Sequence, residues 1–135
     1  MNTMSERLLV TKRKIIDRIN SFRKLKENWD CYNANSFDAT TIDNAILFFD
    51  SLDTDYLNIL SVDDICPTPN ATITIEVRKD RNIVSVEIGN KYYNYFAEIN
   101  GNYLDQEQIL TSTIPVSLNQ ALQQIYIQNS HYEFA

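Results

Sequence analysis

The residue types that most often perform covalent or metal chemistry are scarce in this sequence. Its single histidine, His131, stands close to the end of the 135-residue chain. A Cys-His or Ser-His nucleophilic pair would have to recruit that one residue. The two cysteines, Cys31 and Cys66, are far apart, whereas zinc sites and disulfide frameworks show recognisable cysteine and histidine spacing. The sequence therefore predicts no nucleophilic catalytic pair, no zinc site and no cofactor.

Glycine scarcity excludes several further classes of enzyme. The chain contains two glycines, whereas the P-loop, the dinucleotide fingerprint and the nucleophile elbow each need glycines at fixed spacing. Carboxylates are plentiful, and Glu76 followed by Arg78 is similar to the Glu-x-Lys element of some nucleases, in which the carboxylate holds a metal. Because the cation here is arginine and no aspartate stands on a clear preceding strand, a cross-strand ion pair is favoured. A small divalent-metal enzyme that uses sheet carboxylates remains a third hypothesis, and we assign no catalytic residue and no metal ligand.

The charge of the chain is split between a basic beginning and an acidic remainder. Residues 1–26 carry a net charge of +6 and the rest of the chain −12, which gives −6 overall. Apolar residues recur from residue 5 to residue 26 at three-, four- and seven-residue spacing, which predicts an amphipathic helix with Arg13, Lys14 and Arg18 on its other face. These cations either balance the acidic body as a solvated face or contact a nucleic-acid backbone.

The elements that would position these groups form one α+β domain over residues 1–135. The predicted elements are, in chain order, a basic helix over 1–26, a second helix from the capping Asp38 to about Leu52, an extended connector over 53–70, an antiparallel meander over 72–105, a possible fifth strand over 106–114, a short C-terminal helix after Pro115, and a frayed tail over 127–135. The expected fold class is thus α+β, with two N-terminal helices, four to five antiparallel strands and a short C-terminal helix.

The turns of the meander predict its register. Asp80-Arg81, Gly89-Asn90 and Asn100-Gly101 are taken as two-residue loops, the last being a strong hairpin signal. This choice places Ile75, Val86 and Tyr93 in one cross-strand row, and Val77, Val84 and Tyr95 in the next. Both glycines fall in these turns, where we expect a positive φ. One face of the sheet is then continuously apolar, as a buried face should be.

The other face of the predicted sheet alternates carboxylates with aromatic residues, and no remaining helix is left to cover it. Its candidate partner-binding residues are Glu76, Glu87, Tyr92, Phe96 and Glu98. Aromatic side chains are enriched in protein interfaces. The face is either merely solvated or a surface that binds a protein partner.

A compact polar and aromatic motif follows the first helix. Trp29 is the only tryptophan of the chain, and it stands between Asn28 and Asp30. The indole would bury well in the joint between the two helices and the sheet. The two polar side chains can accept hydrogen bonds from the backbone at the helix end and in the following turn. We interpret these three residues as a structural corner.

The residues Asn28 to Ala34 also carry a resemblance to known proteins. They resemble the Asn-Trp-Asp-Gly-Tyr-Gly-Ala motif of a family of small, uncharacterised bacterial proteins. In that family the motif is followed by a helix, a Pro-x-Pro element and a strand, which correspond here to residues 40–52, Pro67 with Pro69, and residues 71–77. The resemblance implies the same order of elements more than it implies a function.

The sequence-level hypothesis for function rests on the negative charge of the body. Dense negative charge steers association with cationic surfaces and selects among partners. We expect a non-enzymatic protein-binding module of a bacterium or its phage, such as an antitoxin, immunity protein or anti-defence inhibitor, whose partner has a basic surface. Nucleic-acid binding through the first helix is the alternative from another class. The two cysteines show no framework spacing and no apolar signal segment precedes the first helix, so we expect a reduced, cytoplasmic location. The apolar runs are shorter than the roughly twenty residues of a membrane span, so we expect no membrane partner. We leave the oligomeric state open.

Overall fold

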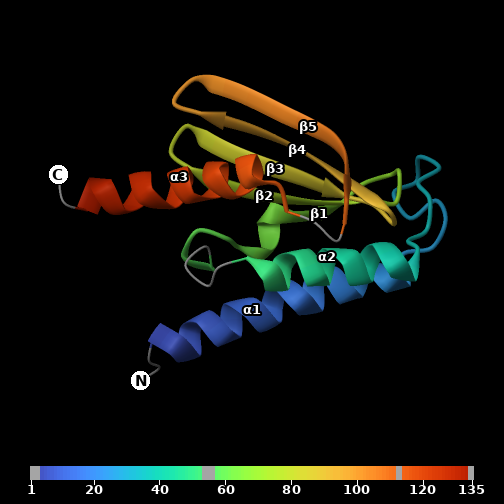
Figure 1. The fold of residues 1–135 in the computed structure, drawn as a ribbon. Coiled ribbons are helices and arrows are strands. Elements are labelled where there is room, and N and C mark those ends of the chain that lie inside the picture. The colour runs from blue at the N-terminus through green and yellow to red at the C-terminus, as the bar shows by residue number, and fades with distance from the viewer. Residues whose placement is uncertain (1–3, 53–56, 112–113, 134–135) are drawn as a thin grey trace.

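The computed structural model describes residues 4–52, 57–111 and 114–133, and it has the predicted α+β architecture (Figure 1). Its helices are α1 (Met4–Ser21), η1 (Phe22–Lys24), α2 (Ala39–Ser51), η3 (Val62–Asp64) and α3 (Val116–Glu133). Its strands are β1 (Ile65–Pro67), β2 (Ile73–Lys79), β3 (Asn82–Ile88), β4 (Tyr92–Ile99) and β5 (Asn102–Leu110). All strands pair antiparallel in the order β1-β2-β3-β4-β5. The helices α1, α2 and α3 lie on one side of this sheet (Figure 1).

The two N-terminal helices follow their sequence signals closely. The Asp38 carboxylate accepts a hydrogen bond from the Thr40 N–H at 3.1 Å and caps α2 as predicted. The first helix is shorter than predicted, because α1 ends at Ser21 and a single 3-10 turn leads to Leu25, where the backbone becomes extended. Tightening to 3-10 geometry is a common way for a helix to end.

The register of the sheet confirms one predicted hairpin and corrects another. Val77 lies opposite Val84, so the β2–β3 turn has two residues, as expected. In the next hairpin Tyr93 lies opposite Ile88 rather than Val86, and the Gly89 N–H donates to the Tyr92 carbonyl at 2.9 Å. The turn is therefore centred on Asn90-Lys91 and not on the predicted Gly89-Asn90. Of the two glycines, Gly101 has a positive φ, of 80°, and Gly89 does not. Gly89 instead allows the backbone at residues 89 and 92 to approach closely, since a Cβ at position 89 would lie 3.2 Å from the Tyr92 carbonyl oxygen.

The fifth strand of the sheet is not the one that the sequence suggested. The strand β5 runs unbroken from Asn102 to Leu110, so it includes the start of the segment predicted as a separate strand over 106–114. The additional strand is β1, which lies in the predicted connector and pairs with β2. The C-terminal helix is confirmed, but it continues through Glu133, so most of the expected frayed tail over 127–135 is helical.

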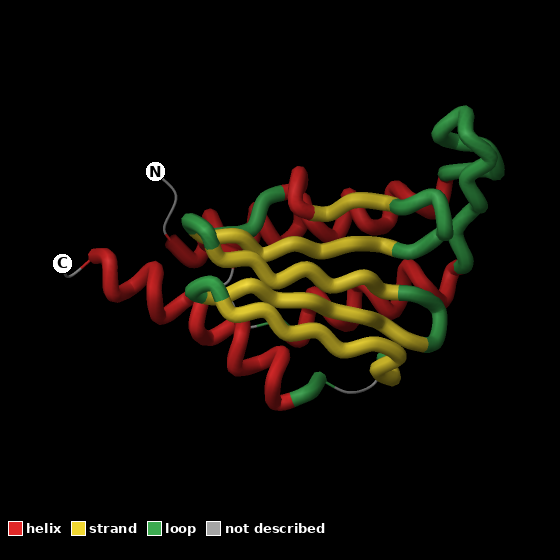
Figure 2. The backbone as a smooth tube through the Cα atoms, turned by 90° about the horizontal axis from the view of Figure 1, so that it is seen from above, coloured by secondary structure: helices red, strands yellow, loops and turns green. Residues whose placement is uncertain are grey.

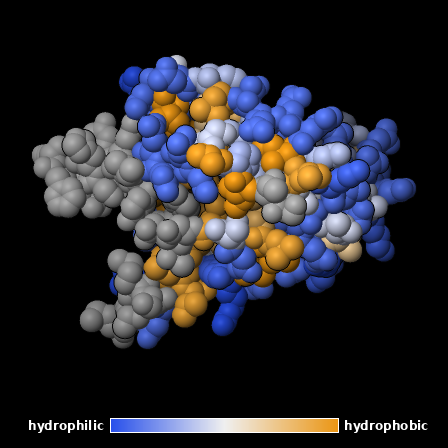
Figure 3. Space-filling view, in the orientation of Figure 1, coloured by the Kyte–Doolittle hydropathy of each residue, from blue (hydrophilic) through white to orange (hydrophobic). Residues whose placement is uncertain are grey.

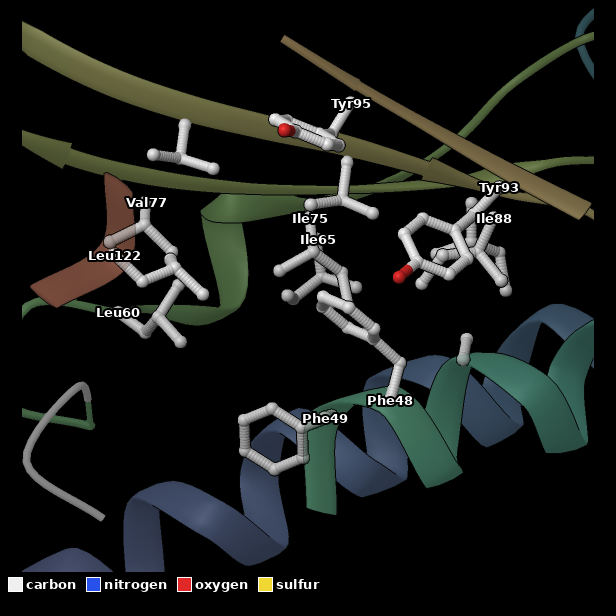
Figure 4. Close-up of a cluster of buried hydrophobic side chains, with 14 of the residues drawn as sticks. Phe48, Phe49, Leu60, Ile65, Ile75, Val77, Ile88, Tyr93, Tyr95 and Leu122 are labelled. Atoms are coloured by element: carbon white, nitrogen blue, oxygen red, sulfur yellow. The ribbon is translucent and has the colours of Figure 1, made fainter. Parts of the chain in front are cut away.

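The core lies between the sheet and the helices. Its sheet side consists mostly of alternate buried residues of β2, β3 and β4, and its helix side includes Phe48 and Phe49 of α2 and Leu122 of α3 (Figure 4). The rings of Phe48 and Tyr93 meet with centroids 5.6 Å apart. From the side, apolar side chains are visible mostly across the middle of the molecule, and the right-hand end is largely hydrophilic (Figure 3). Among the described helices, none is long and apolar enough to span a bilayer.

Candidate functional site

The face of the sheet that points away from the helices is uncovered, and we call it the open face (Figure 2). It consists of the strand residues that alternate with the buried ones. The open face comprises Thr74, Glu76, Arg78, Ile83, Ser85, Glu87, Tyr92, Asn94, Phe96, Glu98, Tyr103, Asp105 and Glu107. Alternation follows from the two-residue period of a strand, so the sequence pattern alone orients these side chains.

The open face is hollowed over the strands β2 to β5. A hollow of about 310 Å³ lies there, and Thr74, Ser85, Glu87, Asn94, Phe96, Tyr103, Asp105 and Glu107 are among its lining residues. Ser85 is 7% exposed although it belongs to this face. The rings of Phe96 and Tyr103 stack with centroids 6.1 Å apart, and these side chains are 37% and 63% exposed. The hollow thus joins a polar floor to an exposed aromatic pair.

The open face is strongly negative. Its strands carry the carboxylates of Glu76, Glu87, Glu98, Asp105 and Glu107 and a single guanidinium, that of Arg78. The guanidinium is already paired, because Arg78 Nη2 lies 2.5 Å from Glu76 Oε2, and this neighbouring carboxylate raises the pKa of Arg78. Within the part of the chain that the structure describes, Glu98, Asp105 and Glu107 make no ion pair. A cationic group approaching this face would therefore meet several uncompensated carboxylates.

One carboxylate of the open face is held in place by threonine hydroxyls. The Thr72 hydroxyl donates to Glu87 Oε2 at 2.5 Å, and the hydroxyl oxygens of Thr68 and Thr72 lie 2.6 Å apart. Glu87 is partly buried, whereas the acidic residues of β5, Asp105 and Glu107, are exposed. Its position on the rim of the hollow is thus fixed before any partner arrives.

The five candidate partner-binding residues do not all contribute equally to the hollow. Glu87 and Phe96 line it. Glu76 lies across from Ser85, and Glu98 across from Tyr103, so both stand beside the lining residues. Tyr92 lies at the far end of β4, opposite Leu110, with the Lys91 ammonium 5.3 Å from its ring centre. The structure therefore brings four of the five together and leaves Tyr92 outside.

The site prediction missed Glu107, an acidic residue of the open face that lies next to a β-bulge in β5. Between the Tyr93–Ile109 and Tyr95–Gln106 pairs, β5 has one residue more than β4, and Gln108 has a φ of 56°. The Asn94 side chain accepts the Gln108 N–H at 2.9 Å and closes the bulge. The extra residue lets Ile109 turn into the core while Glu107 stays on the open face. The apolar Ile109 stands at a position where simple alternation along β5 expects an open-face residue. This break in the pattern was the sequence signal that could have revealed the bulge.

The basic face of α1 is partly consumed by contacts within the molecule. Arg18 Nε donates to the Ile65 carbonyl oxygen at 2.6 Å, and its guanidinium lies 5.4 Å from the centre of the Phe22 ring. Lys12 forms an ion pair with Asp50 of α2 at 3.1 Å, and Arg23 of the adjoining η1 forms one with Asp43 of α2 at 2.6 Å. Of the candidate nucleic-acid contacts, Arg13 and Lys14 are exposed and Arg18 serves α1–β1 packing.

The predicted corner residues organise the loop between η1 and α2, at the right-hand end of Figure 1. Asp30 Oδ1 accepts the N–H groups of Tyr32 and Ala34 at 2.8 and 3.1 Å, and Asn28 Oδ1 accepts that of Asn33 at 2.8 Å. The Trp29 indole donates to the Asn35 carbonyl at 2.9 Å. The indole is partly buried rather than enclosed between the helices and the sheet. These contacts are local to the loop.

No cluster of three or more metal-ligating side chains occurs among the described residues. The Glu76 carboxylate, considered for a metal site, is engaged by Arg78. Comparison of the chain with protein-family models, curated proteins and solved structures finds no match. The open face is therefore the site that its own geometry and charge single out.

Proposed function

We propose that the protein is a non-enzymatic binding module that engages a basic surface of a partner protein through the open face. The observation that carries this proposal is the hollow, where uncompensated carboxylates surround an exposed aromatic pair on an uncovered sheet. Exposed carboxylates steer a cationic partner during approach. An aromatic pair supplies apolar area that is desolvated on contact, as in interface hot spots.

The concrete form that we favour is an inhibitor of the antitoxin, immunity or anti-defence type. Such an inhibitor would cover a basic, nucleic-acid-binding site of its partner with its own acidic surface. The net charge of −6 and the concentration of carboxylates on one hollowed face support this form. Arg18, by contrast, donates its hydrogen bond to the Ile65 carbonyl within the protein, which argues against its contacting a nucleic acid.

The proposal can be tested with two triple variants that change the net charge equally. The first removes three carboxylates of the open face: Glu87→Gln, Glu98→Gln and Asp105→Asn. The second removes three exposed carboxylates elsewhere: Asp17→Asn, Glu27→Gln and Asp80→Asn. Binding of each variant to poly-L-lysine at about 50 mM salt measures where a cation prefers to bind, because exposed charges are only partly screened there.

We expect the open-face triple variant to bind poly-L-lysine at least about tenfold more weakly than the control triple variant, since only the former loses clustered charge. Equal affinities of the two triple variants would contradict the proposal. Once a natural partner is known, Phe96→Ala should speed its dissociation with little effect on association. Glu98→Gln should mainly slow association at low salt.

A further inference from the structure

The strand β5 is a long, exposed edge of the sheet. It occupies the last position in the strand order and covers Asn102–Leu110. Of its residues only Ile109 is buried. An edge strand presents a row of backbone N–H and C=O groups that can pair with another strand.

The register shows which backbone groups of β5 point away from the sheet. The β4–β5 turn has two residues, Asn100 and Gly101, with φ values of 53° and 80°. In such a hairpin the flanking pair, here Ile99 with Asn102, exchanges both hydrogen bonds. Bonded and non-bonded pairs then alternate along the strands. The N–H and C=O groups of Tyr103 and Asp105 consequently face outward, on the stretch before the bulge.

The opposite edge of the sheet is closed to such pairing. The strand β1 has three residues and ends at Pro67, which has no N–H to donate. The Ile65 carbonyl of this strand already accepts the Arg18 side chain. Among the described strands, only β5 therefore offers an extended edge.

The two sides of β5 would meet an added strand with different chemistry. On the open face its side chains are Tyr103, Asp105 and Glu107, which belong to the acidic hollow. On the helix side Leu104 is 37% exposed and lines a second hollow of about 230 Å³ together with Ala121 of α3. Alternate residues of an added strand would point to these two sides in turn.

We propose that the edge of β5 binds an extended segment of the partner protein in which cationic and apolar side chains alternate. The cations would lie beside Asp105 and Glu107, with an arginine able to stack on the exposed Tyr103 ring, and the apolar residues would cover Leu104. Main-chain hydrogen bonds to Tyr103 and Asp105 supply affinity, and the alternating side chains supply specificity, as in other cases of strand addition. This inference rests on the proposed function, because it takes the partner to be basic, and it adds the conformation and the sequence pattern of the bound segment.

A second copy of this chain is a poorer occupant of the same edge. Antiparallel pairing of the whole of β5 with itself would be centred on Gln106 and would place Asp105 opposite Glu107. Like charges directly opposite each other destabilise a strand pair. Acidic residues and a bulge on an edge strand also oppose self-association, and the same acids attract a basic strand.

The test uses the whole protein and synthetic hexapeptides. The probe is acetyl-Arg-Val-Arg-Val-Arg-Val-amide, labelled for fluorescence anisotropy. One control has the same composition in blocks, acetyl-Arg-Arg-Arg-Val-Val-Val-amide. A second control is the alternating peptide N-methylated at two adjacent central residues, which removes one donor from each edge of the peptide without changing its charge.

We expect the alternating peptide to bind about tenfold more tightly than either control, because only it can form the ladder and direct its side chains correctly. We also expect it to slow hydrogen exchange of the Tyr103 and Asp105 amides by about tenfold or more. If the N-methylated peptide binds as tightly as its parent, the strand-docking proposal is wrong, while binding that still depends on the open-face carboxylates would keep the proposed function. If the alternating peptide does not bind, strand docking is equally wrong, and the poly-L-lysine assay decides the proposed function separately.

A pair of protein variants separates backbone from charge. Asp105→Pro removes an outward N–H together with a carboxylate, whereas Asp105→Asn removes the carboxylate alone. We expect Asp105→Pro to bind the alternating peptide about tenfold more weakly than Asp105→Asn, with both folded by circular dichroism. Equal binding by the two folded variants would overturn the proposal, as would a wild-type dimer in sedimentation that Asp105→Pro dissociates. If Asp105→Pro fails to fold, the N-methylated peptide remains the deciding measurement.

Discussion

Arg18 should contribute far more to the stability of the protein than the exposed cations on the basic face of α1. Its Nε–H donates to the Ile65 carbonyl at 2.6 Å, and its guanidinium lies 5.4 Å from the Phe22 ring centre. A hydrogen bond from a charged group contributes about 1.5–3 kcal/mol, and a cation–π contact at a partly exposed site about 0.5–1 kcal/mol. Because the carbonyl belongs to an edge strand and water can partly replace Arg18, we take the lower end. We expect Arg18→Ala to lower the free energy of unfolding by about 2 kcal/mol.

Urea denaturation followed by circular dichroism measures this loss, and Arg13→Ala is the matched control. Both variants remove one positive charge from the same helix, but Arg13 is exposed and makes no ion pair with the described residues. The control should change the free energy of unfolding by less than about 0.5 kcal/mol. With a urea slope of about 2 kcal/mol per molar, Arg18→Ala should lower the midpoint by about 1 M.

The result that would refute this reasoning is a pair of midpoints that agree within error. It would mean that the Arg18–Ile65 contact does not form in solution, and that Arg18 is available for phosphate contacts together with Arg13 and Lys14. Arg18→Lys gives a further check, because lysine keeps the charge but loses the planar guanidinium. It should recover less than half of the lost free energy.

The remaining predictions concern other parts of the fold. Trp29→Ala should lower the free energy of unfolding by about 2 kcal/mol, since the partly buried indole packs on one ring and makes one hydrogen bond; a loss under about 0.5 kcal/mol in urea denaturation would show that the corner is not structural. Burial, with a smaller effect of Tyr95, raises the pKa of Tyr93 to about 12 from 10.0. As the pH rises, the unfolded chain therefore loses this proton first, and the free energy of unfolding should fall by about 1.4 kcal/mol per pH unit between pH 10 and 12. Urea denaturation at each pH measures this slope, and Tyr93→Phe should flatten it. Gly101→Ala should cost about 1 kcal/mol in the same assay, because its φ is 80° and no atom crowds a Cβ there. Electrophoretic mobility shifts at about 50 mM salt should detect no binding to DNA or RNA; salt-dependent binding that weakens in an Arg13→Ala, Lys14→Ala double variant would instead favour the nucleic-acid alternative.

Local signals in the sequence were sufficient for much of the fold. The Asp38 cap, the two-residue turns after Lys79 and Ile99, and the alternation along β2 to β4 are determined by neighbours in the chain. Alternation also oriented the open face, because shifting the β3–β4 pairing by two residues leaves every side chain on its original side. The wrong register of that hairpin therefore did not misplace Glu87 or Phe96.

Contacts between distant segments decided the rest. The short β1 forms a strand because β2 pairs with it and Arg18 donates a hydrogen bond to the carbonyl of Ile65 on its outer edge. Neither partner can be identified from the three residues of β1 alone. The bulge at Gln108 forms because Asn94, fourteen residues earlier, receives its N–H, and this contact keeps Glu107 in the hollow. Outside this bulge, the chain by itself determines which side chains share a face of the sheet, because that depends on the two-residue period of a strand. Only folding brings together the groups that decide three other features. These are which cations are neutralised, where the sheet ends, and how its open face is hollowed.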